Sequence, residues 1–216
     1  EYGGKIINQL KKLGASADWE RERFTMDEGC SKAVQEVFIR LYEKGYIYQG
    51  KRIINWDPVQ RTALSNIEVI HKEIEGAMYY FKYKIVDSDQ ELVIATTRPE
   101  TMFADQAIFV HPDDERYKDL VGKYAINPAN GEKLPIMADS YIDMDFGTAV
   151  MKCTPAHDPN DFALAKKYNL DMPICMNDDG TMNELCHKYQ GMDRFECRKQ
   201  LVADFEAAGI VDHIEK

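Results

Sequence analysis

The stretch "MYYFKYKIVDSDQELVIATT", Met78 to Thr97, sets the fold of this chain. Two runs rich in aromatic and β-branched residues flank the polar turn "DSDQ", which is the pattern of a strand, a turn and a strand. Further short apolar runs follow, such as "AIFV" at 107–110 and "GTAVMKC" at 147–153. Many short strands with few helices between them favour an antiparallel barrel over a parallel βαβ sheet. We therefore predict an α+β protein whose residues 77–216 form an antiparallel, β-barrel-like domain with peripheral helices.

Residues 1–76 have a different character, because helical spacing replaces the strand pattern. In "TMDEGCSKAVQEVFIRLYEKG", Thr25 and Glu28 have the spacing of a capping box, and apolar residues then recur at helical intervals. The charged "EIEG" at 73–76 is typical of a junction. The sequence therefore predicts a helix-rich segment over residues 1–76 that precedes the β domain.

Composition excludes several classes of protein. The 216 residues carry a formal net charge of -10, which argues against binding nucleic acid through bulk charge. The five cysteines are odd in number and lack a C-x-x-C pair, so they predict reduced thiols in a cytoplasmic protein. No apolar run approaches the ~20 residues of a membrane span. Because the chain opens with Glu1 and no signal-peptide pattern follows, we expect a fragment of a longer protein without a membrane partner.

The polar stretch "KCTPAHDPNDF" at positions 152–162 is the main candidate site. Asp158 before a proline, with Asp161 three residues later, is a good helix start, so both aspartates have a structural explanation. Lys152 and Thr154 alternate on the preceding strand and therefore share one face of it. Strand, tight loop and helix start would thus bring several polar groups into one small space.

Three kinds of chemistry fit this stretch. A metal site would use His157, Asp158 and Asp161, but Lys152 would repel a cation, and no standard zinc motif is present. A second option is a nucleophilic Cys153 with His157, four residues later, as its base. However, Cys153 should point to the face of the strand opposite Lys152, which is more typical of a buried thiol. The third is recognition, in which carboxylates pair with an ammonium and the lysine with an anion. Recognition is the interpretation we favour, with no metal.

A second polar segment, "ATTRPETMFADQ", occupies positions 95–106. Thr97 and Glu100 again have capping-box spacing, so a capped turn explains them. Arg98 is always charged and suits contacts to phosphate or ribose. Alone, this segment is a weak signal of function.

Several segments in order resemble the valyl-tRNA synthetase family, among them "LGASADWERERFTMDEG", "TTRPETMFADQAIFVHPDDERYKDLVGK" and "KCTPAHDPNDF". "TTRPET" is similar to the valyl version, whereas isoleucyl relatives have a tryptophan after the proline and leucyl ones usually an aspartate. The H-I-G-H and K-M-S-K-S signatures of the catalytic core are absent. The resemblance implies an editing domain over 77–216 and a preceding piece of the catalytic domain over 1–76.

In this family the editing pocket hydrolyses threonine wrongly attached to the valine tRNA. By resemblance, Asp161 holds the α-ammonium of the substrate, and Asp158 reads the threonine hydroxyl. Lys152 and Thr154 line the pocket near the scissile ester, where they and Asp161 are the catalytic candidates. With no evident protein nucleophile, direct attack by water is expected.

The resemblance also implies partners. Arg98 and Phe146 would position the terminal adenosine and the strand end of the tRNA. The expected partners are the acceptor end of tRNA(Val), the mischarged threonine and the remainder of the synthetase chain. No cofactor is expected in this fragment, whereas ATP and magnesium are expected for the full synthetase. The alternative is a non-catalytic fragment that docks tRNA and is inactive without the rest of the enzyme.

Two positions depart from the family pattern. The family commonly has F-G-T-G-A-V-K where this chain has "FGTAVMK", so Ala149 replaces a glycine, and we expect a change in backbone geometry or pocket space. Many relatives carry C-P-x-C after N-W, where this chain has "NWDPVQR", with Asp57 at the first of those positions. We therefore expect no zinc knuckle there.

Overall fold

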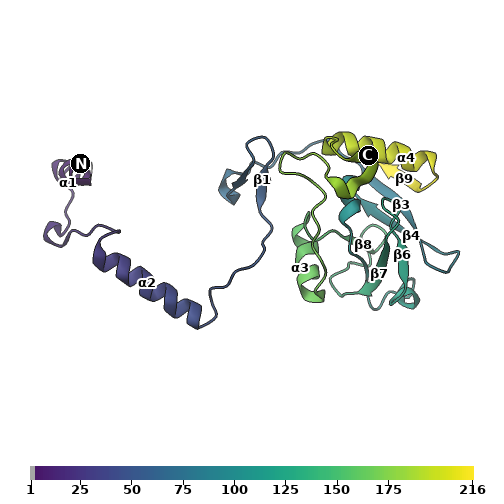
Figure 1. Cartoon of the computed structure of the whole chain (residues 1–216), viewed down its shortest axis with the longest axis horizontal. Helices are drawn as coiled ribbons and strands as arrows, with labels where there is room; N and C mark the ends of the chain where they lie inside the picture. Colours follow the sequence, from purple (N-terminus) through teal and green to yellow (C-terminus); the bar gives the residue numbers. More distant parts are fainter. Residues whose placement is uncertain (1–2) are drawn as a thin grey trace. The chain divides into compact units, whose positions relative to one another are not determined.

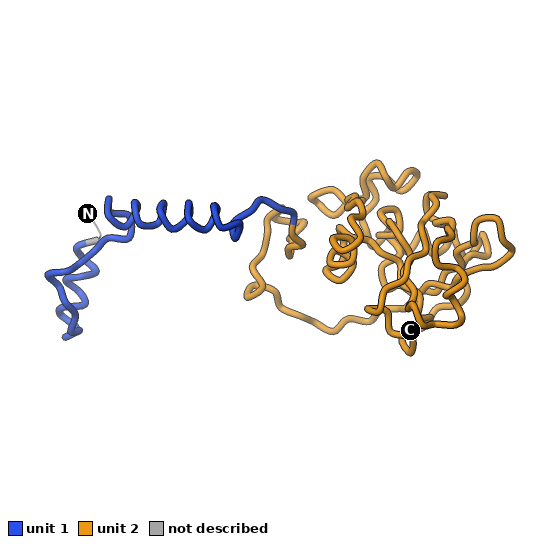
Figure 2. The backbone as a smooth tube through the Cα atoms, turned by 90° about the horizontal axis from the view of Figure 1, so that it is seen from below, with its two compact units in different colours: residues 1–51 blue, residues 52–216 orange. Residues whose placement is uncertain are grey.

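The computed structural model describes residues 3–216, and the chain divides into two compact units, 1–51 and 52–216 (Figure 2). The first unit contains α1 (Gly3–Lys12), a 3-10 turn η1 (Trp19–Arg21) and α2 (Glu28–Glu43). α2 begins where the Asp27 carboxylate accepts a hydrogen bond from the Cys30 amide at 2.8 Å. The helix is where its periodicity predicts it, but its cap is Asp27 and not the expected Thr25, because the side chain of Asp27 reaches the exposed amide.

Three sheets form the second unit (Figure 1). The first is the hairpin β1 (Asn55–Asp57) and β2 (Thr62–Leu64). The second has the order β4-β3-β9, with bounds Glu91–Thr96, Met78–Lys84 and Val211–Glu215. The third has the order β6-β7-β5-β8, with bounds Tyr124–Ile126, Lys133–Ala138, Ala107–Val110 and Val150–Cys153.

Two helices and several 3-10 turns complete this unit. α3 spans Pro159–Tyr168 and α4 spans Arg194–Ala207, and α4 packs against η3 and β9. The 3-10 turns are η2 (Asn66–Glu68), η3 (Pro99–Ala104), η4 (Lys118–Leu120) and η5 (Glu184–Tyr189). The predicted α+β class is thus confirmed. Within residues 3–216 no helix combines the length and the apolar character needed to cross a bilayer.

The predicted strand pair at 78–97 is β3 and β4, antiparallel from Tyr79 opposite Thr96 to Lys84 opposite Glu91. One pairing differs from the antiparallel expectation, because β5 and β7 run parallel. β5 is buried at every position, as expected for a central strand covered on both faces. A run of four apolar residues carries no information about strand direction, so the sequence could not reveal this pairing.

The core of the second unit consists of two clusters. The larger one joins the sheet containing β3 to α4, where Phe81 and Phe205 meet edge to face with ring centroids 5.3 Å apart. The smaller one gathers Phe109, Cys153 and Leu164 under α3. β4 also packs against β8, and the polar segments at 95–106 and 152–162 begin at the ends of these two strands.

The second unit begins at Arg52, and hairpin β1–β2 therefore belongs to it. The indole nitrogen Nε1 of Trp56 donates to the carbonyl oxygen of Asp178 at 2.8 Å, and Arg61 pairs with Asp179 at 3.5 Å. The boundary expected between residues 76 and 77 lies inside this unit. It stays a prediction about where the editing domain starts.

Candidate active site

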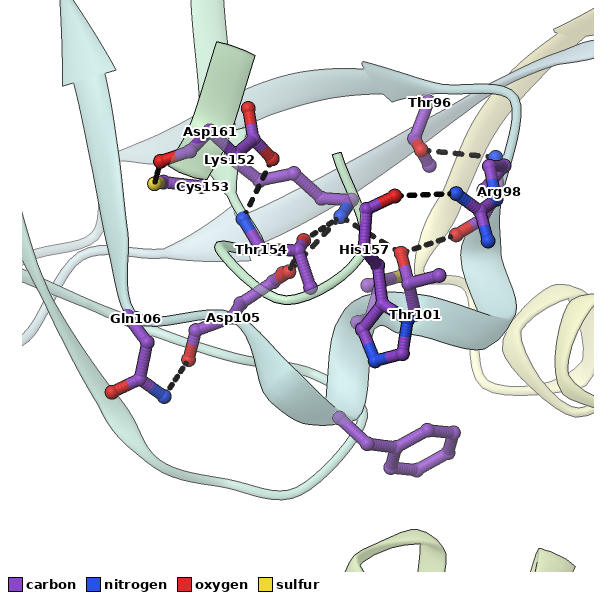
Figure 3. Close-up of polar contacts among 12 residues, drawn as sticks. Thr96, Arg98, Thr101, Asp105, Gln106, Lys152, Cys153, Thr154, His157 and Asp161 are labelled. Carbon is purple, nitrogen blue, oxygen red and sulfur yellow. Dashed lines mark hydrogen bonds and ion pairs between the residues drawn. The ribbon is translucent and has the colours of Figure 1, made fainter. Parts of the chain in front are cut away.

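A pocket of about 250 Å³ lies at the end of β4, beside β8 and the start of α3. Five of the six predicted site residues line it: Arg98, Lys152, Thr154, Asp158 and Asp161. Figure 3 shows how β8, the loop after it and the turn after β4 bring most of these side chains together. As the expected alternation requires, Lys152 in β8 and Thr154 directly after this strand both line the pocket.

The floor of the pocket, defined here as Asp105, Lys152 and Thr154, is a closed polar network. Lys152 Nζ donates to Asp105 Oδ1 at 3.0 Å, to Thr101 Oγ1 at 3.2 Å and to the hydroxyl of Thr154. The Thr154 hydroxyl donates in turn to Asp105, and the Tyr83 hydroxyl donates to Asp105 Oδ2 at 3.3 Å. Since an ammonium has three donors, all those of Lys152 are used, and its position is fixed.

Asp105 is fully buried, and Lys152 is 8% exposed. Burial is the largest influence on the Asp105 carboxyl and raises its pKa, while the Lys152 ammonium and the Thr154 hydroxyl act in the opposite direction. A buried ion pair is costly to break from one side, because the remaining charge is left in a medium of low polarity. The floor therefore couples the chemistry of the pocket to the stability of the fold.

Asp161 lies in the first turn of α3 and is 7% exposed. Its Oδ2 accepts a hydrogen bond from the Thr154 amide at 2.7 Å, and its Oδ1 accepts none from the residues that the structure describes. Burial raises the pKa of Asp161 to about 6, against the opposing effects of the Thr154 amide and the Lys152 ammonium. At neutral pH the carboxylate is mostly ionised, with one oxygen left to bind a cation.

Asp158 caps α3, as the helix-start pattern predicts. Its Oδ1 accepts from the amides of Asn160 at 2.7 Å and Asp161 at 3.1 Å. The side chain also lines the pocket, so the structural role does not remove it from the site. Whether Asp158 reads a substrate hydroxyl stays a prediction.

Cys153 and His157 do not form a nucleophile–base pair. Cys153 is fully buried in the smaller core cluster, its thiol contacts the Asp161 carbonyl oxygen at 3.5 Å, and burial raises its pKa. His157 Nε2 accepts from the Cys175 amide at 3.1 Å. Burial, followed by the charges of Arg98 and Lys152, lowers the pKa of His157 to about 4, so the ring is neutral at pH 7.

Arg98 is held at the mouth of the pocket, with its side chain 44% exposed. Its Nη1 donates to the His157 carbonyl oxygen at 2.6 Å, and its Nε lies 3.5 Å from Glu100 Oε1. Glu100 is buried and accepts two hydrogen bonds from Arg198, each of 2.8 Å. Phe146, the sixth predicted residue, is 70% exposed and is not among the lining residues, so its contact with tRNA stays a prediction.

Sequence reasoning missed Asp105 and Glu100. Both lie in the segment at 95–106, whose capping pattern gave Glu100 a simple structural explanation. A signal was available, because "MFADQAIFV" places a single carboxylate between two apolar runs. A charged residue in such surroundings requires a buried partner, and here Lys152 is that partner.

Ala149 has a φ of 58°, is 3% exposed and is not among the lining residues. Its replacement of a family glycine therefore acts on backbone geometry, since an L-residue in the left-handed region costs about 1–2 kcal/mol. In hairpin β1–β2, Asp57 Oδ1 accepts from the amides of Val59 and Gln60 at 2.8 and 3.3 Å. Across residues 3–216 there is no group of three or more His, Cys, Asp or Glu residues that could hold a metal ion.

A family model and the curated relatives that match this chain point to the same family. A family model described as tRNA synthetases class I (I, L, M and V) matches residues 1–202. The chain is 56% identical over 216 residues to a valine–tRNA ligase of Halalkalibacterium halodurans and 57% identical over 215 residues to that of Bacillus subtilis. In both cases the match covers 100% of this chain and 24% of the ligase, so the chain spans about a quarter of these relatives.

Among solved structures, the chain is similar to a leucyl-tRNA synthetase of Agrobacterium radiobacter K84 in a ternary complex with tRNA and LeuAMS. The match has a TM-score of 0.52 at 18% identity and covers 98% of this chain and 35% of that chain. At this identity the similarity concerns the fold alone. The chain therefore belongs to the class I tRNA synthetases (I, L, M and V), as a segment homologous over its whole length to valine–tRNA ligases.

Proposed function

We propose that this chain hydrolyses the ester that joins a mischarged threonine to tRNA(Val). The observation that carries this proposal is the environment of Asp161, an ionised carboxylate with one open oxygen in a small pocket. The α-ammonium of an aminoacyl ester is the cation that this oxygen would bind. Asp161 thus fixes the ester carbonyl at one place beside the floor, which is an orientation effect.

Discrimination of threonine from valine is the reason for such a pocket. The two side chains are nearly isosteric, so an apolar synthetic site rejects threonine only weakly. A site that hydrogen-bonds the hydroxyl does better, because valine would leave its polar groups buried and unpaired. The second oxygen of Asp158 is the proposed partner of the threonine hydroxyl, while its first oxygen caps α3.

The proposed reaction is direct attack by water. The water oxygen bonds to the carbonyl carbon, the bond from that carbon to the ribose oxygen breaks, and the water supplies the proton that the ribose oxygen takes. The positive charge of Lys152, held in place by Asp105, favours the negative charge that develops on the carbonyl oxygen. Thr154 holds Lys152 and, through its amide, Asp161, so it ties the two charged groups together.

The proposed partners are the acceptor end of tRNA(Val) and the remainder of the synthetase. Arg98 lines the pocket and is the proposed contact of the terminal adenosine, because a guanidinium suits phosphate and ribose oxygens. The exposed ring of Phe146 is of the kind that stacks on a base. The likeness to a synthetase solved with tRNA supports this choice of partner through the fold alone.

A second candidate is a fragment that docks tRNA but needs the rest of the synthetase for hydrolysis. It is favoured by α2, none of whose residues is buried. Val34 and Phe38, for example, are 66% and 55% exposed. Apolar residues at helical spacing require a covering surface, which the first unit does not supply by itself.

The test is to incubate the purified chain with threonyl-tRNA(Val) and valyl-tRNA(Val) and to measure ester loss above the spontaneous rate. Selective loss of the threonyl ester is expected. If the chain hydrolyses neither ester but the complete enzyme selectively hydrolyses the threonyl ester, the docking fragment would be supported. Equal loss of both esters would contradict a pocket that reads the threonine hydroxyl.

A further inference from the structure

A second pocket, of about 530 Å³, adjoins the first within the same compact unit. Arg98 and His157 line both pockets, so they form a shared wall. The remaining walls come from the chain leading into hairpin β1–β2, the segment at 174–180 and the start of α4. The hydrogen bond from Trp56 to Asp178 holds the first two of these together.

Positive charge is concentrated in this second pocket, although the whole chain carries a net charge of -10. Arg52, Arg98 and Arg194 line it, against Asp178 as the one acidic lining residue. Among the residues that the structure describes, Arg194 forms no ion pair, and its guanidinium lies 4.5 Å from the ring centre of Phe195. A cation without an acidic partner in a pocket is available for an anionic ligand.

The backbone leaves space for this guanidinium. Gly180 has a φ of 79°, and a Cβ at that position would lie 2.3 Å from Arg194 Nη1 and 3.3 Å from the Cβ of Pro58. Only a glycine accepts this conformation without strain while the hairpin and α4 approach so closely. The guanidinium is thus seated against the segment at 174–180, within the wall of the pocket.

Apolar surface accompanies the charge. Trp56 is anchored by its Nε1 and remains 40% exposed, while Ile54 and Ile174 are 57% and 59% exposed. An anchored aromatic ring with arginines around it is the combination that binds single-stranded nucleic acid, because the ring stacks on a base and the guanidinium pairs with a phosphate.

We propose that the second pocket binds the nucleotide that precedes the aminoacylated adenosine in a single-stranded RNA 3′ end. Arg194 pairs with the phosphodiester, Trp56 offers its exposed face to the base, and Arg98 in the shared wall contacts the backbone between the two pockets. This inference rests on the proposed function, since that function places the terminal adenosine in the first pocket. Continuity of the two pockets through Arg98 supports a strand that crosses from one to the other.

The test is equilibrium binding of a fluorescent single-stranded RNA of four nucleotides, without an amino acid, to the whole chain. Arg194→Gln is expected to weaken binding about tenfold, as for loss of a charged hydrogen bond. It should also reduce the slope of log K against log salt by about 0.7, the value for one phosphate of a single strand. Lys199→Gln is the matched control, because it removes one charge from the same helix outside the pocket, and binding should not change.

Equal RNA binding by the wild type and Arg194→Gln, or equal weakening by Lys199→Gln, would overturn this inference, as would a wild-type chain that does not bind the RNA. Thermal melting of each variant separates loss of binding from loss of fold. Because the RNA carries no ester, its binding is measured independently of hydrolysis. If the chain binds RNA through Arg194 but does not hydrolyse threonyl-tRNA, the proposed hydrolysis would be contradicted. The RNA-binding role of the second pocket would still be supported.

Discussion

The floor and the rim of the first pocket are built on different principles. The floor residues Asp105, Lys152 and Thr154 are 0%, 8% and 1% exposed, and each hydrogen-bonds the other two. The rim, defined as Thr97, Arg98 and Asp158, comes from loops, and the Arg98 side chain is 44% exposed. Substitutions in the floor should therefore affect folding and hydrolysis together, whereas those in the rim should change recognition in a fold that survives.

The largest effect is expected for Lys152→Met, which leaves the Asp105 carboxylate buried without its cation. Breaking a buried pair from one side costs about 3–5 kcal/mol of unfolding free energy, which urea denaturation would measure. The double variant Lys152→Met with Asp105→Asn should recover part of this loss, because no buried charge remains unpaired. Lys199→Met, which breaks an exposed pair with Glu196, is the control and should leave stability unchanged. A floor variant as stable as that control would show that the network does not hold the fold.

Asp161→Asn tests the carboxylate that the proposed reaction uses to hold the ammonium. We expect kcat/KM for threonyl-tRNA(Val) to fall about 100-fold, because a poorly oriented ester reacts slowly. In the wild type, the pKa of about 6 predicts that the rate falls about tenfold per pH unit below pH 6, as the carboxylate becomes protonated. This pH dependence between pH 5 and 7 should disappear in Asp161→Asn, and its persistence would assign it to another group.

The same pKa has the opposite consequence for stability. The folded-state pKa of Asp161 lies above the value of about 3.9 for an unfolded chain, so the folded protein binds the proton more tightly. The stabilising contribution of this group is therefore complete below about pH 4 and is lost as the pH rises through about 6. The activity that depends on Asp161 and its contribution to stability should thus change in opposite directions across this range.

Asp158→Ala separates the two roles of a rim residue. Loss of the cap should cost about 1 kcal/mol of stability. Loss of the hydroxyl partner should narrow the preference for threonyl over valyl ester about tenfold. Asp193→Ala is the matched control, because Asp193 caps α4 through the amides of Phe195 and Glu196. If both variants lose stability equally and neither alters the preference, Asp158 is a cap alone.

The smallest effect is expected for Ala149→Gly, outside the residues that line the pocket. Glycine removes the strain of the left-handed conformation but loses more conformational entropy on folding than alanine does. The net effect should be a stabilisation of about 1 kcal/mol. Ala165→Gly, in α3, should destabilise it by a similar amount. Thermal unfolding of the pair would reveal opposite shifts in Tm, and a shift in the same direction would mean that Ala149 is not strained.

The floor was partly predictable from sequence, since alternation along one strand put Lys152 and Thr154 on one face. Asp105 was not predicted, because its contact with Lys152 depends on pairing between β5 and β8, which lie far apart in the chain. The direction of the strands in the third sheet was also not predictable. β5 is buried on both faces, so its sequence does not alternate between polar and apolar residues. The helix start at Asp158 was predictable from local capping alone, whereas the second pocket requires tertiary folding to bring Arg52 and Arg194 to the lining of one cavity.

The position of a bound threonyl group decides most directly whether this pocket receives the ester. We would determine the crystal structure of the chain with a threonyl-adenosine whose ester is replaced by an amide that water does not cleave. The threonyl ammonium is predicted within about 3 Å of Asp161 Oδ1, with the side-chain hydroxyl at Asp158. A threonyl group bound on another surface, or an ammonium that does not contact Asp161, would contradict the proposed site.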